Sequence, residues 1–295
     1  MSKKNNKSFY NFKFLTIYTL IVVLLSFIVT YFFINNLKPK ENKTNANIEK
    51  LSTEYYVSKP NEENENVILH GSRDKKKIAL TFDAEMTEGM KLNYLSGRVK
   101  SSYDPRIVEV LNQTNTKATF FLTGMWIELY PKVTKELAQN PLFELGSHSY
   151  TDTSYNGPCF GLKQIPDSLN VEQVGSTEKL LREHARIDNQ LFRFPGGCYN
   201  KEDIKTVKES GDIIVHWDVA GSDGFNENAK SIVSNVVKNT QNGSIIVLHL
   251  NGAPTAPKTA EALPEIILIL KKNGYEFVKV NELLGLPKEN TSTNF

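Results

Sequence analysis

The chain has 295 residues, enough for one or two domains, and its 40% hydrophobic and 23% charged residues exclude collagen-like, wholly disordered and disulfide-dense miniprotein classes. Charge is uneven: residues 1–60 hold nine basic and three acidic side chains, and the remainder holds 26 basic and 30 acidic ones. A slightly acidic body argues against nucleic acid as the main partner.

The first expected element is an uncharged run of 21 residues, 14–34. A helix over this run would be about 31 Å long, close to the thickness of a bilayer's hydrocarbon core. We expect a single transmembrane anchor with residues 1–13 in the cytoplasm, because four lysines precede the run and three follow it. The alternative is a cleaved signal peptide, although Asn-Asn-Leu-Lys-Pro-Lys after Ile34 offers no small-residue cleavage site. Either interpretation places the body outside the cytoplasm, and the anchor would hold it at the cell membrane.

Residues 35–66 have the composition of a polar linker, and 288–295 that of a loose tail. Between them, 67–287 alternates strand and helix patterns. Strands are expected at 77–82, 118–123, 142–145, 191–194, 213–217, 244–249 and 277–280. Helices are expected at 104–112, 126–139, 171–187, 203–210, 229–237 and 260–272. This alternation predicts an α/β domain whose parallel sheet curls into a barrel. The long connection 86–103 is either a substrate-contacting loop or a surface insertion.

Polar side chains gather where the expected strands end. These ends read TFDAE (81–85), GSHSYTD (146–152), RFPGGC (193–198), WDVAGSD (217–223) and VLH (247–249). Taken singly, each polar residue has a structural alternative, such as a helix cap or a structural ion pair. Because the chemistry of a parallel barrel lies at the carboxyl ends of its strands, the set together predicts an active site.

These segments, in this order, resemble the motifs of the polysaccharide deacetylase family, carbohydrate esterase family four. The resemblance extends over residues 76–286 and is closest to a subgroup with TFDA followed by an acidic residue. That subgroup also has a downstream run similar to NGAPTAPKTAEALPEII, which spans 251–267 here. The resemblance implies a distorted (β/α)7 barrel and metal-dependent removal of N-acetyl groups from a glycan.

The resemblance also implies roles for individual residues. Asp83 aligns with the general base that takes a proton from water, and His249 with the acid that protonates the leaving amine. Arg193 would keep Asp83 ionised, and Asp223 would orient His249. Trp217, Leu248 and Pro195 are expected at the substrate, with Trp217 and Leu248 as an apolar wall for the acetyl methyl group. Simple core packing is the alternative for Leu248.

The metal ligands depart from the family pattern of an Asp after the base and two His four residues apart. Ala84 follows the base and binds no metal, His148 is retained, and Asp152 stands at the second His position. In one interpretation Glu85 joins His148 and Asp152 as ligands of a divalent cation, zinc or else manganese, cobalt or nickel. In the other, metal binding is lost and the protein is a glycan-binding pseudoenzyme.

Two cysteines, Cys159 and Cys198, follow the second and third motifs. An exported body favours a disulfide over two free thiols, and both motifs line one cleft in the family fold. We expect this bond to fix the loop beside the site. The resulting hypotheses are a membrane-anchored deacetylase of peptidoglycan, a pseudoenzyme on the same fold, or a deacetylase of a chitin-like or poly-N-acetylglucosamine polymer.

Overall fold

The computed structural model describes residues 66–157, 159–188 and 190–286. The expected anchor at 14–34, nearly all of the linker and the tail lie outside these residues. Within the described ranges, no helix is both long enough and apolar enough to span a bilayer.

The described strands form one nine-stranded sheet in the order β1-β6-β5-β4-β3-β2-β8-β7, with β9 also paired to β2. Every pairing between named strands is parallel. The bounds are β1 Val67–Ile68, β2 Lys77–Ala84, β3 Ala118–Leu122, β4 Phe143–Ser147, β5 Leu191–Phe192, β6 Ile213–Val215, β7 Val219–Ala220, β8 Ile245–His249 and β9 Glu276–Val278. β2 is buried at every position except Lys77, as expected of a central parallel strand covered on both faces.

The α/β class and the curled parallel sheet agree with the sequence analysis, but a closed seven-stranded barrel does not form. β1 and β7, at the two ends of the order, each pair with one neighbour in the described part of the chain. The strand expected at 213–217 ends at Val215, and the two-residue β7 pairs with β8 instead. No long strand is therefore left to close the ring, and the sheet is a half-barrel.

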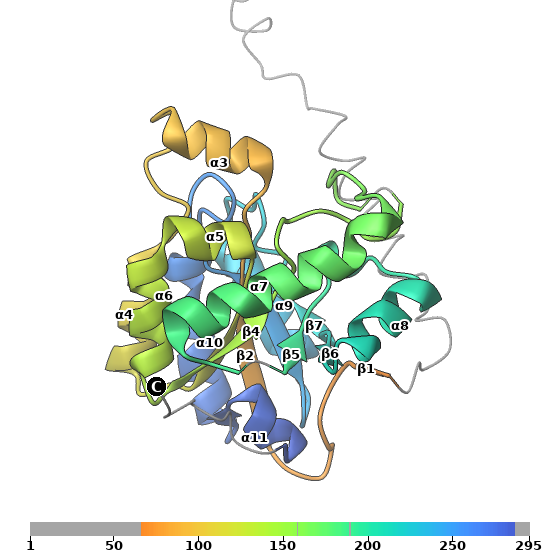
Figure 1. The fold of residues 1–295 in the computed structure, drawn as a ribbon. Helices are drawn as coiled ribbons and strands as arrows, with labels where there is room; N and C mark the ends of the chain where they lie inside the picture. The colour runs from red at the N-terminus through yellow and green to blue at the C-terminus, as the bar shows by residue number, and fades with distance from the viewer. Residues whose placement is uncertain (1–65, 158, 189, 287–295) are drawn as a thin grey trace, which may run out of the picture. The chain divides into compact units, whose positions relative to one another are not determined.

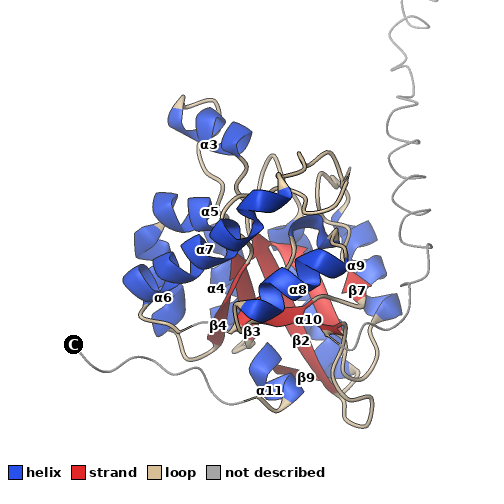
Figure 2. Cartoon of the chain, turned by 45° about the vertical axis from the view of Figure 1, so that its right-hand side comes forward, coloured by secondary structure: helices blue, strands red, loops and turns tan. Residues whose placement is uncertain are grey.

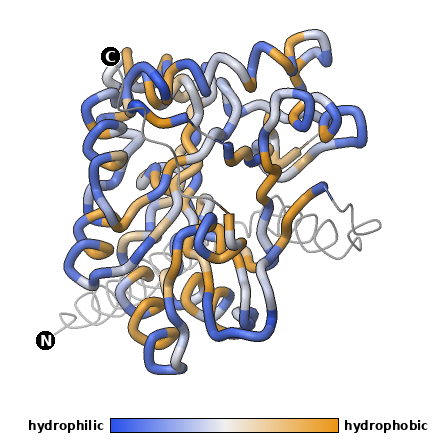
Figure 3. The backbone as a smooth tube through the Cα atoms, turned by 60° about the horizontal axis from the view of Figure 1, so that its bottom comes forward, coloured by the Kyte–Doolittle hydropathy of each residue, from blue (hydrophilic) through white to orange (hydrophobic). Residues whose placement is uncertain are grey.

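Helices cover the outside of the sheet (Figure 2). Their bounds are α3 Glu88–Leu95, α4 Pro105–Gln113, α5 Gly124–Leu129, α6 Pro131–Gln139, α7 Asn170–Ala185, α8 Lys201–Glu209, α9 Ala229–Asn239, α10 Thr259–Lys272 and α11 Val280–Leu284, with 3₁₀ turns η1 Asp167–Leu169 and η2 Pro195–Gly197. Local caps set several starts: the Asp104 side chain accepts from the Arg106 amide, and Asn200 forms a capping box with Asp203. Hydrophobic and hydrophilic bands alternate along the outer helices, as amphipathic packing requires (Figure 3).

Two helical regions between residues 86 and 139 differ from the sequence analysis. Pro131 restricts Tyr130 to a non-helical conformation (φ −125°, ψ 48°), so the helix expected at 126–139 becomes α5 and α6. The connection 86–103 contains α3, which begins where the Thr87 side chain accepts from the Met90 amide and buries none of its residues. Figure 1 shows α3 at one end of the sheet, where β2 finishes, and α11 at the opposite end.

Candidate active site

The carboxyl ends of the strands bring the expected polar residues to one edge of the sheet. In sheet order these are Arg193 after β5, His148 and Asp152 after β4, Asp83 and Glu85 at β2, His249 at β8 and Asp223 after β7. Asp83 and His249 are register partners on adjacent strands. The parallel register therefore places the expected base next to the expected acid.

Arg193 is fully buried and reaches from β5 to the Asp83 carboxylate, with 2.7 Å between Nη1 and Oδ1. The same nitrogen donates to Thr81 Oγ1 at 2.8 Å. Nε and Nη2 donate to the carbonyl oxygens of Val215 at 3.2 Å and His216 at 3.1 Å. Burial lowers the pKa of the guanidinium, and the Asp83 charge opposes that shift. Asp83 thus has a fixed cation on one oxygen, while Oδ2 faces the cluster of ligand candidates.

His148 presents one ring nitrogen to that cluster. Its Nδ1 lies 2.9 Å from the carbonyl oxygen of Arg193, a contact that requires Nδ1 to carry the proton. Nε2 then holds a lone pair, is buried without a hydrogen-bond partner, and lies 3.8 Å from Asp83 Oδ2. Burial lowers the pKa of His148, although Asp83 and Glu85 oppose the shift. A neutral imidazole with a buried, aimed lone pair is the usual form of a metal-ligating histidine.

Asp152 and Glu85 complete a three-residue cluster around this lone pair. One ligand atom of each of Glu85, His148 and Asp152 lies within 4.8 Å of the others. Asp152 Oδ1 is also buried without a hydrogen-bond partner. Burial and then the Glu85 charge raise the pKa of Asp152 well above its ordinary value. Each unpartnered buried atom costs about 1–3 kcal/mol, so the two of them, beside the Glu85 carboxylate, fit a divalent cation with oxygen and nitrogen ligands.

His249 has carboxylates on both ring nitrogens. Nδ1 lies 2.7 Å from Asp223 Oδ1, and Nε2 lies 3.1 Å from Glu85 Oε1. The backbone amide of His249 and Thr259 Oγ1 both donate to Asp223 Oδ2, at 2.8 and 2.5 Å. Burial lowers the pKa of His249, but Asp223 and Glu85 raise it well above its ordinary value. Burial raises the pKa of Asp223, but its contacts with His249 and Thr259 lower that pKa below its ordinary value. The imidazole is therefore held as a cation, able to give up a proton from Nε2.

Two positioning residues were missed by the sequence analysis. Asn251 Oδ1 accepts from the Glu85 amide at 3.0 Å, and Asn251 Nδ2 donates to the Glu85 carbonyl at 2.7 Å. These two bonds fix the backbone that carries Glu85. Thr259 supports Asp223 in a similar way. Both lie in the run NGAPTAPKTAEALPEII, whose recurrence in the resembling subgroup was a signal that could have identified them.

The expected substrate residues differ in exposure. Trp217 is half-buried, and its ring centroid lies 5.5 Å from the guanidinium carbon of Arg193. Pro195 is buried in η2, and Leu248 has no exposed surface and belongs to the main hydrophobic core. Trp217 is therefore the one of the three with surface to offer a substrate in this conformation.

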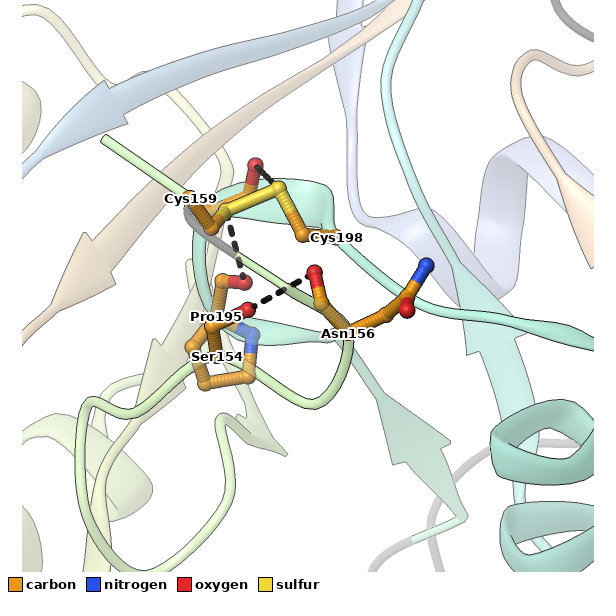
Figure 4. The surroundings of a disulfide bond; sticks show 6 residues. Ser154, Asn156, Cys159, Pro195 and Cys198 are labelled. Atoms are coloured by element: carbon orange, nitrogen blue, oxygen red, sulfur yellow. Dashed lines mark hydrogen bonds between the residues drawn. A yellow bond between two sulfur atoms is a disulfide. The ribbon is translucent and has the colours of Figure 1, made fainter. Parts of the chain in front are cut away.

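A disulfide joins Cys159 and Cys198, as expected (Figure 4). Cys159 Sγ lies 4.0 Å from the carbonyl oxygen of Pro195, directly over the RFPGG turn. Gly196 has φ 60°, and a Cβ at that position would approach Cys159 Sγ to 2.5 Å. A glycine is thus required where the disulfide contacts the turn that follows Arg193.

Comparison with known proteins places this site in context. A family model described as polysaccharide deacetylase matches residues 70–212. The chain is 34% identical over 185 residues to a Bacillus cereus peptidoglycan-N-acetylglucosamine deacetylase, an alignment that covers 62% of this chain and 82% of the relative.

Solved structures with the same fold include an enzyme and a pseudoenzyme. One is the Bc1960 peptidoglycan N-acetylglucosamine deacetylase bound to an N-hydroxybenzamide, with TM-score 0.64, 28% identity, and coverage of 76% of this chain and 95% of that one. Another is BA3943 from Bacillus anthracis, named a pseudoenzyme of carbohydrate esterase family four, with TM-score 0.60, 25% identity, and coverage of 74% and 68%. A shared fold therefore does not establish catalytic activity, which depends on the side chains of the site.

Proposed function

The chain belongs to the polysaccharide deacetylase family, and we propose that it hydrolyses N-acetyl groups of peptidoglycan with the help of a divalent cation. The observation that carries this proposal is the convergence of the buried His148 and Asp152 with the partly exposed Glu85, between the Asp83–Arg193 and His249–Asp223 pairs. A site that had lost its chemistry would have no need to bury two unpartnered ligand atoms beside an acid and a base. The substrate named for the Bacillus cereus relative supports peptidoglycan as the polymer.

The side chains divide the reaction between them. Glu85, His148 and Asp152 would hold the divalent cation, which when bound would lower the pKa of a water molecule and polarise the acetyl carbonyl. Asp83 accepts the water's proton on Oδ2, because Arg193 occupies Oδ1. His249 gives its Nε2 proton to the departing amine, while Asp223 holds Nδ1 and thereby the ring orientation. Glu85 connects the ligand cluster with the acid through its 3.1 Å contact to Nε2.

We propose zinc as the cation, with manganese, cobalt or nickel as alternatives. Glu85 and Asp152 offer two carboxylates against the single imidazole of His148. This oxygen-rich set should prefer zinc less strongly than a set with two imidazoles does, which makes manganese, cobalt and nickel the alternatives. Metal content of the purified chain, measured for all four elements, tests this choice.

Acetate release from peptidoglycan by the full chain tests the function, with each metal added in turn after chelation. Glu85→Gln and Asp83→Asn should each lower the rate by at least about 10²-fold. Glu265→Gln, on the exposed face of α10, is the matched control and should keep the wild-type rate. Metal-dependent release that survives Glu85→Gln would retain the enzyme but remove Glu85 from the ligands.

A glycan-binding pseudoenzyme is the second candidate, because Ala84 occupies the position of a usual ligand and a similar fold carries that name. Retained glycan binding with no acetate release under any metal would establish it. Chitin oligosaccharides and poly-N-acetylglucosamine in the same assay test the third possibility. Faster release from either than from peptidoglycan would reassign the substrate.

We also propose that residues 14–34 anchor the chain in the cell membrane with the catalytic unit outside the cell. The support is the uncharged length of this run and the lysines that flank it. Protease treatment of intact cells should degrade the catalytic unit while a cytoplasmic marker survives. Equal protection of both would contradict this topology.

A further inference from the structure

The backbone between the ligand candidates His148 and Asp152 has an uncommon conformation. Ser149 has φ 67° and no exposed surface, and few residues other than glycine occupy this left-handed region. Such conformations persist only where the surrounding structure imposes them, and they concentrate at functional sites. The contacts that impose this turn therefore also set how the two ligand candidates are placed relative to each other.

A single side-chain oxygen accepts three hydrogen bonds from this turn. Gln173 Oε1, near the start of α7, accepts from the Thr151 amide at 2.9 Å, from Thr151 Oγ1 at 3.0 Å and from Ser149 Oγ at 3.2 Å. Because the backbone amide of Thr151 can only donate, the Gln173 atom that faces it is the carbonyl oxygen of the side-chain amide. Gln173 is 8% exposed, so these bonds are shielded from water. The side chain thus ties α7 to both residues inside the turn.

Two further hydroxyl groups extend these bonds in a fixed direction. Ser149 Oγ gives its one proton to Gln173, so the Tyr155 hydroxyl, 2.8 Å away, must be the donor to Ser149. For the same reason Thr153 Oγ1 donates to Thr151 Oγ1 at 2.8 Å. Both chains of hydroxyl groups therefore end at the Gln173 oxygen, and loss of that one acceptor would disturb the whole turn.

Backbone bonds hold the turn at its two ends. The Gly124 amide, at the start of α5, donates to the Ser149 carbonyl at 3.0 Å. The Asp152 amide donates to the Met86 carbonyl at 3.1 Å. These bonds need no particular side chain at position 149 or 152. Gln173 is therefore the side chain on which the middle of the turn depends.

We propose that Gln173 is a positioning residue for the metal ligands, because it holds the turn 149–151 in the shape that lets His148 and Asp152 reach one cation. This inference rests on the proposed function and extends it to a residue behind the ligands. An aspartate carboxylate ends closer to its own Cα than an imidazole Nε2 does. The backbone at position 152 must therefore lie nearer to the cation than a histidine at that position would require, and the Gln173 contacts fix that backbone.

Titration calorimetry of the chelated full chain with zinc, manganese, cobalt and nickel tests this role. Gln173→Met keeps the side-chain length but removes the acceptor oxygen. It should weaken binding of the tightest metal about 10–100-fold, the usual effect of losing a residue that orients a ligand. Gln173→Glu keeps an acceptor oxygen at the same place, so it should bind that metal at least as tightly as the wild type does.

Val174→Ala is the matched control for a merely structural effect. Val174 is fully buried on the same helix, in a cluster with Phe192 and Ile214, and its side chain has no polar atom to offer the turn. Its truncation should lower the melting temperature, as Gln173→Met should, but leave the metal affinity unchanged.

Three results would overturn the inference: equal metal affinity in Gln173→Met and the wild type, an equal loss of affinity in Val174→Ala, or no binding of any of the four metals by the wild type. Absent acetate release from a wild type that binds metal would instead refute the proposed function. The comparison of affinities would then still test the inference, because calorimetry needs no turnover.

Discussion

Replacing Arg193 with methionine tests how far the fold of the site depends on its buried ion pair. The guanidinium makes four hydrogen bonds, to Asp83, Thr81 and two backbone carbonyls, and Asp83 has 3% exposed surface. Arg193→Met keeps most of the side-chain volume but leaves the Asp83 carboxylate buried without a cation. Removing one partner of a buried pair costs about 3–5 kcal/mol, out of a total stability of about 5–15 kcal/mol. At roughly 2–4 °C per kcal/mol, the melting temperature should fall by about 10 °C.

Arg73→Met is the matched control for this measurement. The Arg73–Asp218 pair has nearly the same distance, 2.8 Å, but its side chains are 37% and 15% exposed, against 0% and 4% for Arg193 and Asp83. Partly exposed pairs contribute about 0–1 kcal/mol, so the control should lose little. Urea denaturation of the full chain, followed by fluorescence, gives both free energies of unfolding. Equal losses in the two variants would refute the claim that burial, and not contact distance, sets the energy.

Three further predictions concern the disulfide, a carboxyl pair and the acid. Cys159→Ser removes the disulfide between positions 39 residues apart and should lower the free energy of unfolding by about 3–4 kcal/mol in the chain-entropy model. An unchanged urea midpoint would contradict this prediction. Burial and then Glu178 raise the pKa of Asp212 to about 9, whereas an unfolded carboxyl titrates near about 3.9. The folded state thus holds the extra proton, and stability should fall as the pH rises from about 4 to about 9. Asp212→Asn should flatten this fall in free energies of unfolding measured from pH 5 to 9. An unaltered slope would show that Asp212 is not its cause. Asp223→Asn should lower kcat for acetate release about 10²-fold or more and move the alkaline limb of its pH profile to lower pH, because Asp223 raises the pKa of His249. A limb that stays in place would show that Asp223 does not set this pKa.

The positions of the site residues could be predicted because they depend on topology. Apolar runs such as 77–82 and 244–249 identify buried parallel strands, and parallel strands place their carboxyl ends at one edge. Asp83 and His249 follow from that rule and from the resemblance to a known family. The Cys159–Cys198 pairing followed from the same reasoning.

The expected contacts of Arg193 with Asp83 and of Asp223 with His249 are present, but the contact between Glu85 and His249 could not be predicted, because it depends on side-chain direction. The pairing of Glu85 with His249 requires the turn after β2 to be fixed by Asn251, 166 residues away. Sheet closure failed for a similar reason: β6 ends at Val215, a local break that the apolar run at 213–217 does not reveal. Leu248 shows that a position matching a family motif can still be filled by core packing.

The central place of β2 has a consequence for how the protein is made. β2 is one of the first strands to be synthesised, yet its partner β8 lies 166 residues later, with Ala79 opposite Ile245. A nascent chain ending at residue 212 would contain Asp83, Glu85, His148, Asp152 and Arg193, but neither His249 nor Asp223. Long-range pairing of this kind forms late and leaves strand edges exposed until it does. Addition of β8 to the sheet therefore also supplies the acid, so a chain that ends before β8 cannot present a full catalytic set.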